Sequence, residues 1–143
     1  MVSDELKAVI HLRAEDLFEG TASSKSVMVD TDHGRGSAPT PMELLLIALG
    51  SCTGVDVVSI LRKKRAEIIE YRVEVRGARR STHPRSYERI EVNHIVTGRN
   101  ISERSLAQAV QLSDEKYCSV AATLRPSAEI VSSFRIIEAG EGE

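Results

Sequence analysis

Cys52 and Cys118 are the two cysteines of this 143-residue chain, and their thiols are its best candidates for nucleophilic and redox chemistry. They lie far apart in the sequence, which contains neither a Cys-x-x-Cys motif nor a clustered Cys/His pair. A zinc site or a thioredoxin-type motif is therefore poorly supported. Because free cysteines are more often buried and inert than reactive, composition alone leaves the role of both thiols open.

Cys52 lies within Gly-Ser-Cys-Thr-Gly, inside a segment that predicts a helix. A glycine in a helix interior costs about 1 kcal/mol relative to alanine, so Gly50 and Gly54 need a packing reason. Small residues at this spacing let another backbone approach closely. We therefore expect a second helix, from this chain or from a partner subunit, to cross here, and Cys52 to face a narrow, dry crevice.

Cys118 is expected near the start of a short helix that Ser113 or Asp114 caps and that Pro126 ends. In the first turn of a helix the free N–H groups and the helix dipole favour a thiolate. Tyr117, its neighbour, is expected in the core.

The helix that carries Cys52 has the clearest local signal. Thr40 suits the N-cap, Pro41 suits the first helical position, and Glu43, three residues after the cap, completes a capping box. We expect the helix to run to about Lys64. Its first two-thirds are apolar nearly all round, which is typical of a helix at the centre of a protein.

Alternating apolar and polar residues predict strands on both sides of this helix, with a polar Gly/Pro loop over 31–40. The expected strands are residues 6–13, 17–22, 26–30, 69–76, 88–96 and 128–137, with a helix over 102–113. This order favours an α+β fold over a doubly wound parallel sheet. The length predicts a single domain over 1–143.

The composition is that of a soluble globular protein, with 41% hydrophobic and 28% charged residues and a net charge of -2. This charge and the absence of Trp argue against nucleic-acid binding. The N-terminus lacks the pattern of a secretory signal, so we expect a cytoplasmic protein. The apolar run over 44–55 ends at Asp56, short of the roughly 20 residues that span a membrane.

Two motifs give the sequence a family resemblance. Thr-Pro-Met-Glu-Leu-Leu-Leu-Ile-Ala-Leu-Gly-Ser-Cys places a cysteine near the middle of a helix that begins with proline, and Tyr-Cys-Ser-Val-Ala-Ala-Thr-Leu opens a late helix with the second cysteine. In order and spacing, from Thr40 to the last strand, the chain resembles the OsmC/Ohr superfamily (osmotically inducible protein C and organic hydroperoxide resistance protein). The resemblance implies an OsmC-like fold and an intertwined homodimer with active sites at the subunit interface.

The resemblance also implies a function, a cytoplasmic antioxidant peroxidase of the stress response. Cys52 would attack an organic hydroperoxide and become a sulfenic acid, and Cys118 would condense with it to a disulfide. A dithiol reductant of lipoyl or thioredoxin type would then regenerate both thiols. No cofactor and no metal are expected.

The family activates its reactive thiol with an arginine that a glutamate holds, and the mapping of both onto this chain is open. Arg35, between two glycines of the loop, is our choice, with Arg13 as the reserve. The acidic residue of the family directly follows the helix-opening proline, where this chain has Met42. Glu43 is one residue late and, on a straight helix, lies nearly opposite Cys52.

Asp56 is another candidate for the acidic role, because it lies one turn after Cys52 on a similar face. A carboxylate there would repel a thiolate unless it is paired. Asp56 would then hold the arginine or bind across the dimer. Of the histidines, His94 is expected to be a hydrogen-bonded core residue and His33 to be exposed.

Two other kinds of function remain open. An OsmC-like protein with this fold could bind a small apolar or electrophilic molecule between its subunits without peroxidase turnover, and Met42 favours this reading. A purely structural partner protein has only the fold to support it. Convergence of Arg35 and a carboxylate on Cys52 would favour the enzyme.

Overall fold

The computed structural model describes residues 4–32 and 36–140. The chain divides into two compact units, Met1–Leu45 and Leu46–Glu143. Each unit is described by itself. The boundary falls inside the central helix, so the first unit contains the start of this helix and the second unit contains the rest.

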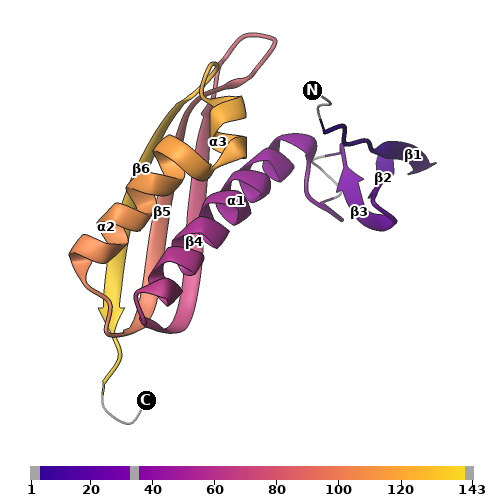
Figure 1. Ribbon diagram of the computed structural model, residues 1–143. Coiled ribbons are helices and arrows are strands. Elements are labelled where there is room, and N and C mark those ends of the chain that lie inside the picture. The colour runs from indigo at the N-terminus through magenta and orange to yellow at the C-terminus, as the bar shows by residue number, and fades with distance from the viewer. Residues whose placement is uncertain (1–3, 33–35, 141–143) are drawn as a thin grey trace. The chain divides into compact units, whose positions relative to one another are not determined.

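The first unit contains a three-stranded antiparallel sheet in the order β1-β2-β3 (Figure 1). Its strands are β1 (Val9–Ala14), β2 (Leu17–Ala22) and β3 (Lys25–Asp30). The three strands expected in this region are confirmed, although β1 begins three residues later than expected. Within the described residues the first unit leaves apolar side chains of this sheet exposed, among them Ile10 and Leu12.

Asp30, at the end of β3, anchors both sides of the loop that follows. Its carboxylate accepts hydrogen bonds from the backbone N–H groups of Asp32 and Ser37, at 2.8 and 3.1 Å. Its own N–H donates to the carbonyl oxygen of Pro39 at 3.0 Å. The buried Asp30 therefore holds the start of the loop, where the chain leaves the sheet, and the end of the loop, just before the next helix.

The central helix, α1 (Pro41–Lys63), begins with the expected capping box. The N–H of Glu43 donates to Oγ1 of Thr40 at 3.2 Å, and the N–H of Thr40 donates to Oε1 of Glu43 at 2.9 Å. Two of the N–H groups that a helix start leaves unpaired are thus satisfied reciprocally. The helix ends one residue before the expected Lys64.

By length and composition α1 passes the test for a membrane-spanning helix, with a mean hydropathy of 2.1 over an 18-residue window of which 33% is buried. Asp56, which was expected to make the apolar run too short to span a membrane, does not change this result. Core helices of soluble proteins pass the same test. Val57 and Leu61 of α1 are fully buried in the second unit, as expected of a core helix.

The second unit is a three-stranded sheet in the order β4-β5-β6 with helices packed on it (Figure 1). Strands β4 (Glu67–Arg79) and β5 (Tyr87–Arg99) form an antiparallel hairpin, and β6 (Glu129–Glu138) pairs with β5 in parallel. The connection from β5 to β6 contains α2 (Glu103–Leu112), the π-helical turn η1 (Ser113–Tyr117) and α3 (Ser119–Leu124). The expected mixture of α and β elements is confirmed.

The segment before Cys118 differs from the expected helix. A five-residue π turn precedes α3, and Cys118 itself, not Ser113 or Asp114, is the N-cap of that helix. Tyr117 is 51% exposed, so the expectation that it lies in the core is wrong. The π turn adds a residue to the helical winding and thereby directs Tyr117 outward and Cys118 inward.

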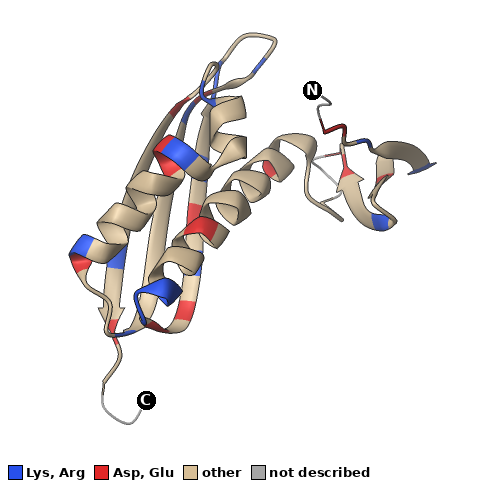
Figure 2. Ribbon diagram, in the orientation of Figure 1, with Lys and Arg blue, Asp and Glu red and all other residues tan. Residues whose placement is uncertain are grey.

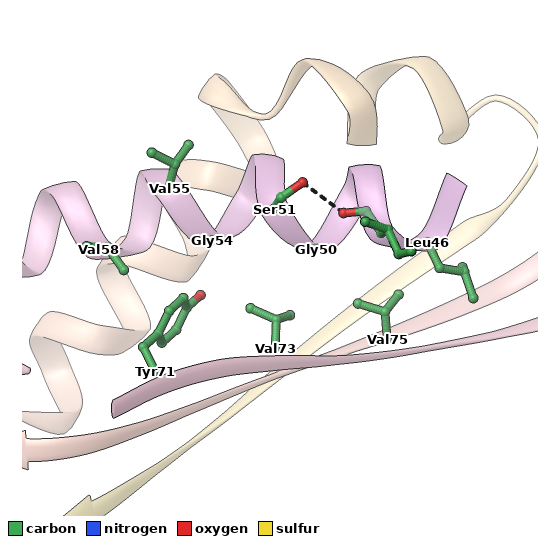
Figure 3. Close-up of a pocket in the computed structure, with 10 residues that line it drawn as sticks. Leu46, Gly50, Ser51, Gly54, Val55, Val58, Tyr71, Val73 and Val75 are labelled. Carbon is green, nitrogen blue, oxygen red and sulfur yellow. Dashed lines mark hydrogen bonds between the residues drawn. The ribbon is translucent and has the colours of Figure 1, made fainter. Parts of the chain in front are cut away.

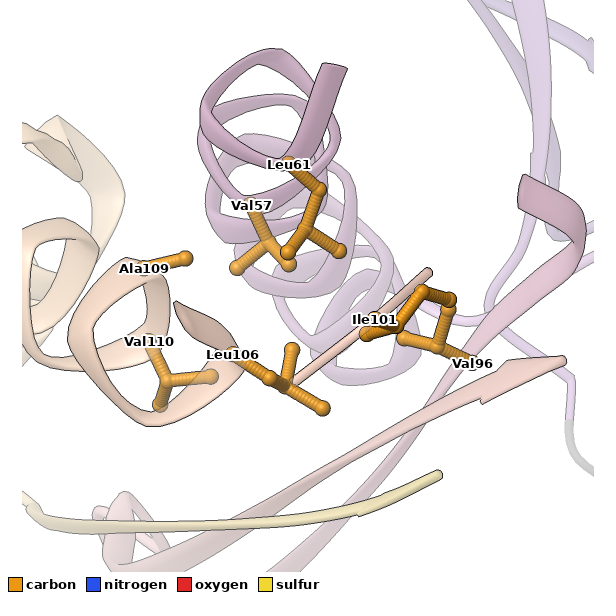
Figure 4. Close-up of a cluster of buried hydrophobic side chains, with 7 residues drawn as sticks. All are labelled: Val57, Leu61, Val96, Ile101, Leu106, Ala109 and Val110. Atoms are coloured by element: carbon orange, nitrogen blue, oxygen red, sulfur yellow. The ribbon is translucent and has the colours of Figure 1, made fainter. Parts of the chain in front are cut away.

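The main core of the second unit lies between α1, α2 and the sheet. Figure 4 shows Val57 and Leu61 of α1 facing Leu106 and Ala109 of α2, with Val96 of β5 at the side of the cluster next to Ile101. The apolar residues of α2 recur at helical spacing, and those of β5 alternate, so each element presents one apolar face to this cluster. This packing holds α1 and the segment after α2 against the same sheet.

The two glycines of α1 face a strand, so the expected crossing helix is not supplied by this chain, and a helix of a partner subunit stays a prediction. A Cβ at Gly50 would lie 3.1 Å from a methyl group of Val75, and one at Gly54 would lie 3.3 Å from the ring of Tyr71. Both neighbours belong to β4, whose side chains point toward α1 in Figure 3. The glycines therefore bring α1 close to the sheet of its own chain, and Cys52 lies on another face of the helix.

Candidate functional site

Cys52 and Cys118 are side-chain neighbours. Cys52, in the middle of α1, is half-buried, and Cys118 is 4% exposed; both are free thiols. The Cys52 thiol lies close enough to Cys118 to raise the pKa of the Cys118 thiol. The structure thus brings together the two predicted redox residues from distant parts of the chain.

The pKa of the Cys118 thiol is raised to about 11, first by burial and further by the adjacent Cys52 thiol. As N-cap of α3, its Sγ accepts a hydrogen bond from the N–H of Ala121 at 3.4 Å, which acts in the opposite direction. The expected stabilisation of a Cys118 thiolate by the helix start is therefore outweighed by desolvation, since burial disfavours the charged form. Cys118 is a protonated thiol at neutral pH.

Ser113 connects the element that carries Cys52 to the one that carries Cys118. Its hydroxyl donates to Oδ2 of Asp56 at 2.8 Å and lies 2.8 Å from Oγ1 of Thr53. Its carbonyl oxygen accepts the N–H of Cys118 at 2.8 Å. Asp56, expected to hold an arginine or to bind across a dimer, has this polar partner within its own chain.

His94 and Tyr71 form a second polar contact in the interior. The Tyr71 hydroxyl lies 2.6 Å from Nδ1 of His94, and burial lowers the pKa of His94 to about 4. Burial, with a smaller effect from the charge of Asp56, raises the pKa of Tyr71. The prediction of a hydrogen-bonded core histidine is confirmed, although among the described residues its Nε2 has no hydrogen-bond partner.

The described structure does not test the residues proposed to activate Cys52. Arg35 and His33 lie outside the described residues. Arg13 forms an ion pair with Glu19 across strands β1 and β2 at 2.7 Å. Glu43 belongs to the capping box. Arg13 and Glu43 lie in the first unit and Cys52 in the second, so both assignments stay predictions.

A groove of about 680 Å³ lies between α1 and β4 in the second unit (Figure 3). Apolar side chains line most of it, including Val55, Val58 and Val73, and Tyr71 and Ser51 add hydroxyl groups. The Ser51 hydroxyl donates to the carbonyl oxygen of Ile47 in its own helix. The groove suits apolar groups better than charged ones.

Charged side chains are sparse along α1 and frequent on the strands (Figure 2). In the second unit, α1 carries Asp56 near its middle and Arg62 and Lys63 at its end, where cations suit the helix dipole. Within residues 4–32 and 36–140, no group of three or more His, Cys, Asp or Glu side chains could hold a metal ion. The chemistry of this site therefore rests on the two thiols and the hydroxyl and carboxyl groups around them.

Sequence reasoning missed the roles of Ser113, Thr53 and Tyr71. Ser113 was expected only as a helix cap, and no local pattern marks it as a partner of two residues on α1. The sequence did contain one signal of these contacts. Thr53 and Asp56 are polar residues three apart on a helix that was otherwise expected to be buried. Buried polar groups need hydrogen-bond partners, so another segment had to supply them.

Residues 34–133 match the family model of OsmC-like proteins. The chain belongs to the OsmC-like family. It is 40% identical over 119 residues to protein YhfA of Escherichia coli strain K12, covering 83% of this chain and 88% of YhfA.

Solved structures agree with this assignment. A hypothetical protein from Aquifex aeolicus VF5 is 36% identical, with a TM-score of 0.87 over 96% of this chain and 100% of the other. The organic hydroperoxide resistance protein OhrB of Bacillus subtilis shares the fold at 14% identity, with a TM-score of 0.62 over 92% of this chain and 98% of OhrB. The expected OsmC/Ohr-like superfamily is confirmed.

Proposed function

We propose that this protein is a thiol-dependent peroxidase that reduces organic hydroperoxides, with Cys52 as the attacking thiol and Cys118 as its resolving partner. The observation that carries the proposal is that the two free thiols are neighbours, close enough for Cys52 to raise the pKa of Cys118. Disulfide formation requires Cα atoms within roughly 7 Å, so two neighbouring thiols need less rearrangement to react than two distant ones. Two buried cysteines with only a structural role would not need to lie next to each other.

The exposure and protonation of the thiols support the division of roles. Cys52 is the less buried of the two, so it is the one that a substrate reaches first. Cys118 has a raised pKa and is protonated at neutral pH, which makes it a poor first nucleophile. Arg35, or Arg13 as the reserve, would stabilise the Cys52 thiolate, with Glu43 or Asp56 holding the arginine.

The proposed reaction proceeds in balanced steps. The Cys52 thiolate attacks one peroxide oxygen, an S–O bond forms, the O–O bond breaks, and the leaving alkoxide takes up a proton to become an alcohol. Cys52 is thereby oxidised to a sulfenic acid. The Cys118 sulfur attacks Sγ of Cys52, and the hydroxyl group leaves with the proton of Cys118 as water. A dithiol of lipoyl or thioredoxin type supplies two electrons to restore both thiols.

The proposed assembly is an intertwined homodimer in the cytoplasm, consisting of a single OsmC-like domain per chain. Two apolar surfaces support it: in the second unit Val55 and Ile47 of α1 are 63% and 54% exposed, and in the first unit the sheet exposes Ile10 and Leu12. Exposed apolar side chains clustered on one element are typical of interaction surfaces. A second copy of the chain would cover these residues.

The similar proteins support the proposed peroxidase chemistry to different degrees. OhrB is by name an organic hydroperoxide resistance protein, but at 14% identity the likeness concerns the fold alone. YhfA, at 40% identity, has a name that states no activity. The peroxidase proposal therefore rests on the thiol pair and the family.

A second candidate is an OsmC-like protein that binds a small apolar or electrophilic molecule without peroxide turnover. The apolar groove between α1 and β4 favours it. So does Met42, which occupies the position at which the family resemblance implies an acidic residue. In this case Cys52 would be retained as a binding or redox thiol.

Turnover distinguishes the two candidates. With cumene hydroperoxide as substrate and dihydrolipoamide as reductant, the enzyme should consume hydroperoxide catalytically, and Cys52→Ser should abolish consumption. A matched control is Thr123→Val, because Thr123 lies exposed on α3 and its hydroxyl bonds only to the carbonyl oxygen of Ser119 in the same helix. Absence of turnover in the wild-type protein would favour the binding protein.

A further inference from the structure

We propose that Ser113, together with Thr53 and Asp56, positions Cys118 for disulfide formation with Cys52; the inference rests on the proposed function and assigns these three residues to its second step. Within residues 4–32 and 36–140, none of the three forms a hydrogen bond with the sulfur atom of Cys52 or Cys118. They act through the backbone that carries the cysteines and are therefore positioning residues.

The connections of Ser113 run in both directions. Through its hydroxyl it is tied to Thr53 and Asp56, which are one and four residues after Cys52 on α1. Through its carbonyl oxygen it accepts the N–H of Cys118, five residues later. This second bond closes the π turn. One residue thus links the helix of the attacking thiol to the backbone of the resolving thiol.

The hydrogen bond between Ser113 and Thr53 is informative because both hydroxyl groups are buried next to apolar side chains. Ser113 is fully buried and Thr53 is 1% exposed, next to the apolar cluster of Val57, Ala109 and Val110. Hydroxyl groups in such a place cost free energy unless they are hydrogen-bonded, and an apolar contact would join two helices as well. Hydrogen bonds add direction, since they fix the distance and angle between two backbones.

The π turn connects the hydrogen bonds of Ser113 with the position of Cys118. A single π turn inside a helical segment is rare and frequently occurs at functional sites. Here it ends the run from α2 and makes Cys118 the extended N-cap of α3, with the side chain directed inward. Without the tie of Ser113 to α1, the turn could relax toward regular helix and move the Cys118 sulfur away from Cys52.

The test compares the stability of the disulfide in variants that keep or remove one hydroxyl. Ser113→Ala removes the hydroxyl and keeps the carbonyl oxygen, Thr53→Val removes a hydroxyl at nearly constant shape, and Thr53→Ser keeps it. Thr123→Val is the matched control. Each full-length protein is equilibrated in glutathione redox buffers, alkylated, and analysed by mass spectrometry for the Cys52–Cys118 disulfide.

For Ser113→Ala we expect a disulfide equilibrium constant about tenfold lower than that of the wild type, or about 30 mV for a two-electron couple. Thr53→Val should shift it in the same direction, and Thr53→Ser and Thr123→Val should stay within about twofold. These changes match the loss of one or two hydrogen bonds. If Ser113→Ala does not fold, as judged by circular dichroism, the pair Thr53→Val and Thr53→Ser makes the same comparison.

A second readout separates positioning from a general loss of structure. After one equivalent of cumene hydroperoxide, Ser113→Ala should slow disulfide formation much more than hydroperoxide consumption, so that a Cys52 sulfenic acid accumulates and is trapped by dimedone. A wild-type disulfide equilibrium in Ser113→Ala and Thr53→Val, or equal slowing of both steps, would overturn the positioning role. A wild-type protein that forms the disulfide with glutathione but ignores hydroperoxide would overturn the proposed function alone.

Discussion

The side chains of Cys52, in the middle of α1, and Cys118, at the start of α3, are neighbours. Burial and the neighbouring thiol together raise the pKa of Cys118, whereas Cys52 is only half-buried. The two thiols therefore differ in accessibility although they lie next to each other. This asymmetry is the basis of the different roles proposed for them.

The raised pKa of Cys118 predicts its alkylation behaviour. Because the thiolate is the reactive form, iodoacetamide should modify Cys118 of the native reduced protein at a rate that increases up to pH about 11. In Cys52→Ser the apparent pKa should fall, since one of its causes is removed, but burial should keep it above the ordinary value of about 8.5. A native Cys118 that titrates near 8.5, like the protein unfolded in guanidinium, would contradict this.

The buried His94 predicts a loss of stability in acid. Its pKa is about 4 in the folded protein and 6.5 without burial, so between these values the unfolded chain binds more protons. The free energy of unfolding should therefore be highest above pH 6.5 and fall as the pH decreases toward 4. Since one pKa unit corresponds to about 1.4 kcal/mol, the loss should be up to about 3 kcal/mol. Urea unfolding at several pH values measures it.

A matched pair of histidine variants tests the assignment of this effect. His94→Asn keeps a polar group near the Tyr71 hydroxyl but does not titrate, so the dependence between pH 4 and 6.5 should be much weaker. His11→Asn, at an exposed position of β1, should leave it unchanged. An unchanged slope in His94→Asn would assign the acid sensitivity to other groups.

The close approach of α1 to β4 at Gly50 predicts that a larger side chain at this position destabilises the protein. Gly50→Val should destabilise the protein by about 1–3 kcal/mol, because its side chain would collide with Val75, and this outweighs the better helix propensity of valine. Ser59→Val, at an exposed position of the same helix, should change stability by less than about 0.5 kcal/mol. Equal effects of both substitutions on thermal unfolding would mean that the glycine is not required for packing.

The exposed face of α1 predicts self-association. Val55→Arg places a charge on an apolar surface that is exposed in the single chain, so it should not prevent folding but should shift the proposed dimer toward monomer. Val131→Arg, on the exposed strand β6, should leave the assembly unchanged. Light scattering after size-exclusion chromatography gives the mass. A wild-type protein that elutes as a monomer at every concentration would refute the homodimer.

Local patterns in the sequence predicted the elements well. The capping box of Thr40 and Glu43 involves residues three apart, so the start of α1 could be read directly. The alternation in residues 69–76 and 88–96 predicted strands β4 and β5 for the same reason. In each case the interactions that determine the element lie within a few residues of it.

Features that depend on tertiary contacts were missed or assigned wrongly. The neighbour of Gly50 and Gly54 could have been a helix or a strand, because small residues permit both. The hydrogen bonds of Ser113 to Thr53 and Asp56 of α1 span more than fifty residues, so no local pattern indicates them. The pKa of Cys118 was expected to be lowered by the helix start, but burial, which only the fold determines, dominates.

The most direct test of the central claim is thiol counting by mass spectrometry on wild type, Cys52→Ser and Cys118→Ser after one equivalent of cumene hydroperoxide. The proposal predicts a Cys52–Cys118 disulfide in the wild type, a sulfenic or over-oxidised Cys52 in Cys118→Ser, and an unmodified Cys118 in Cys52→Ser. Unreacted thiols in all three proteins would contradict the peroxidase and favour the binding protein.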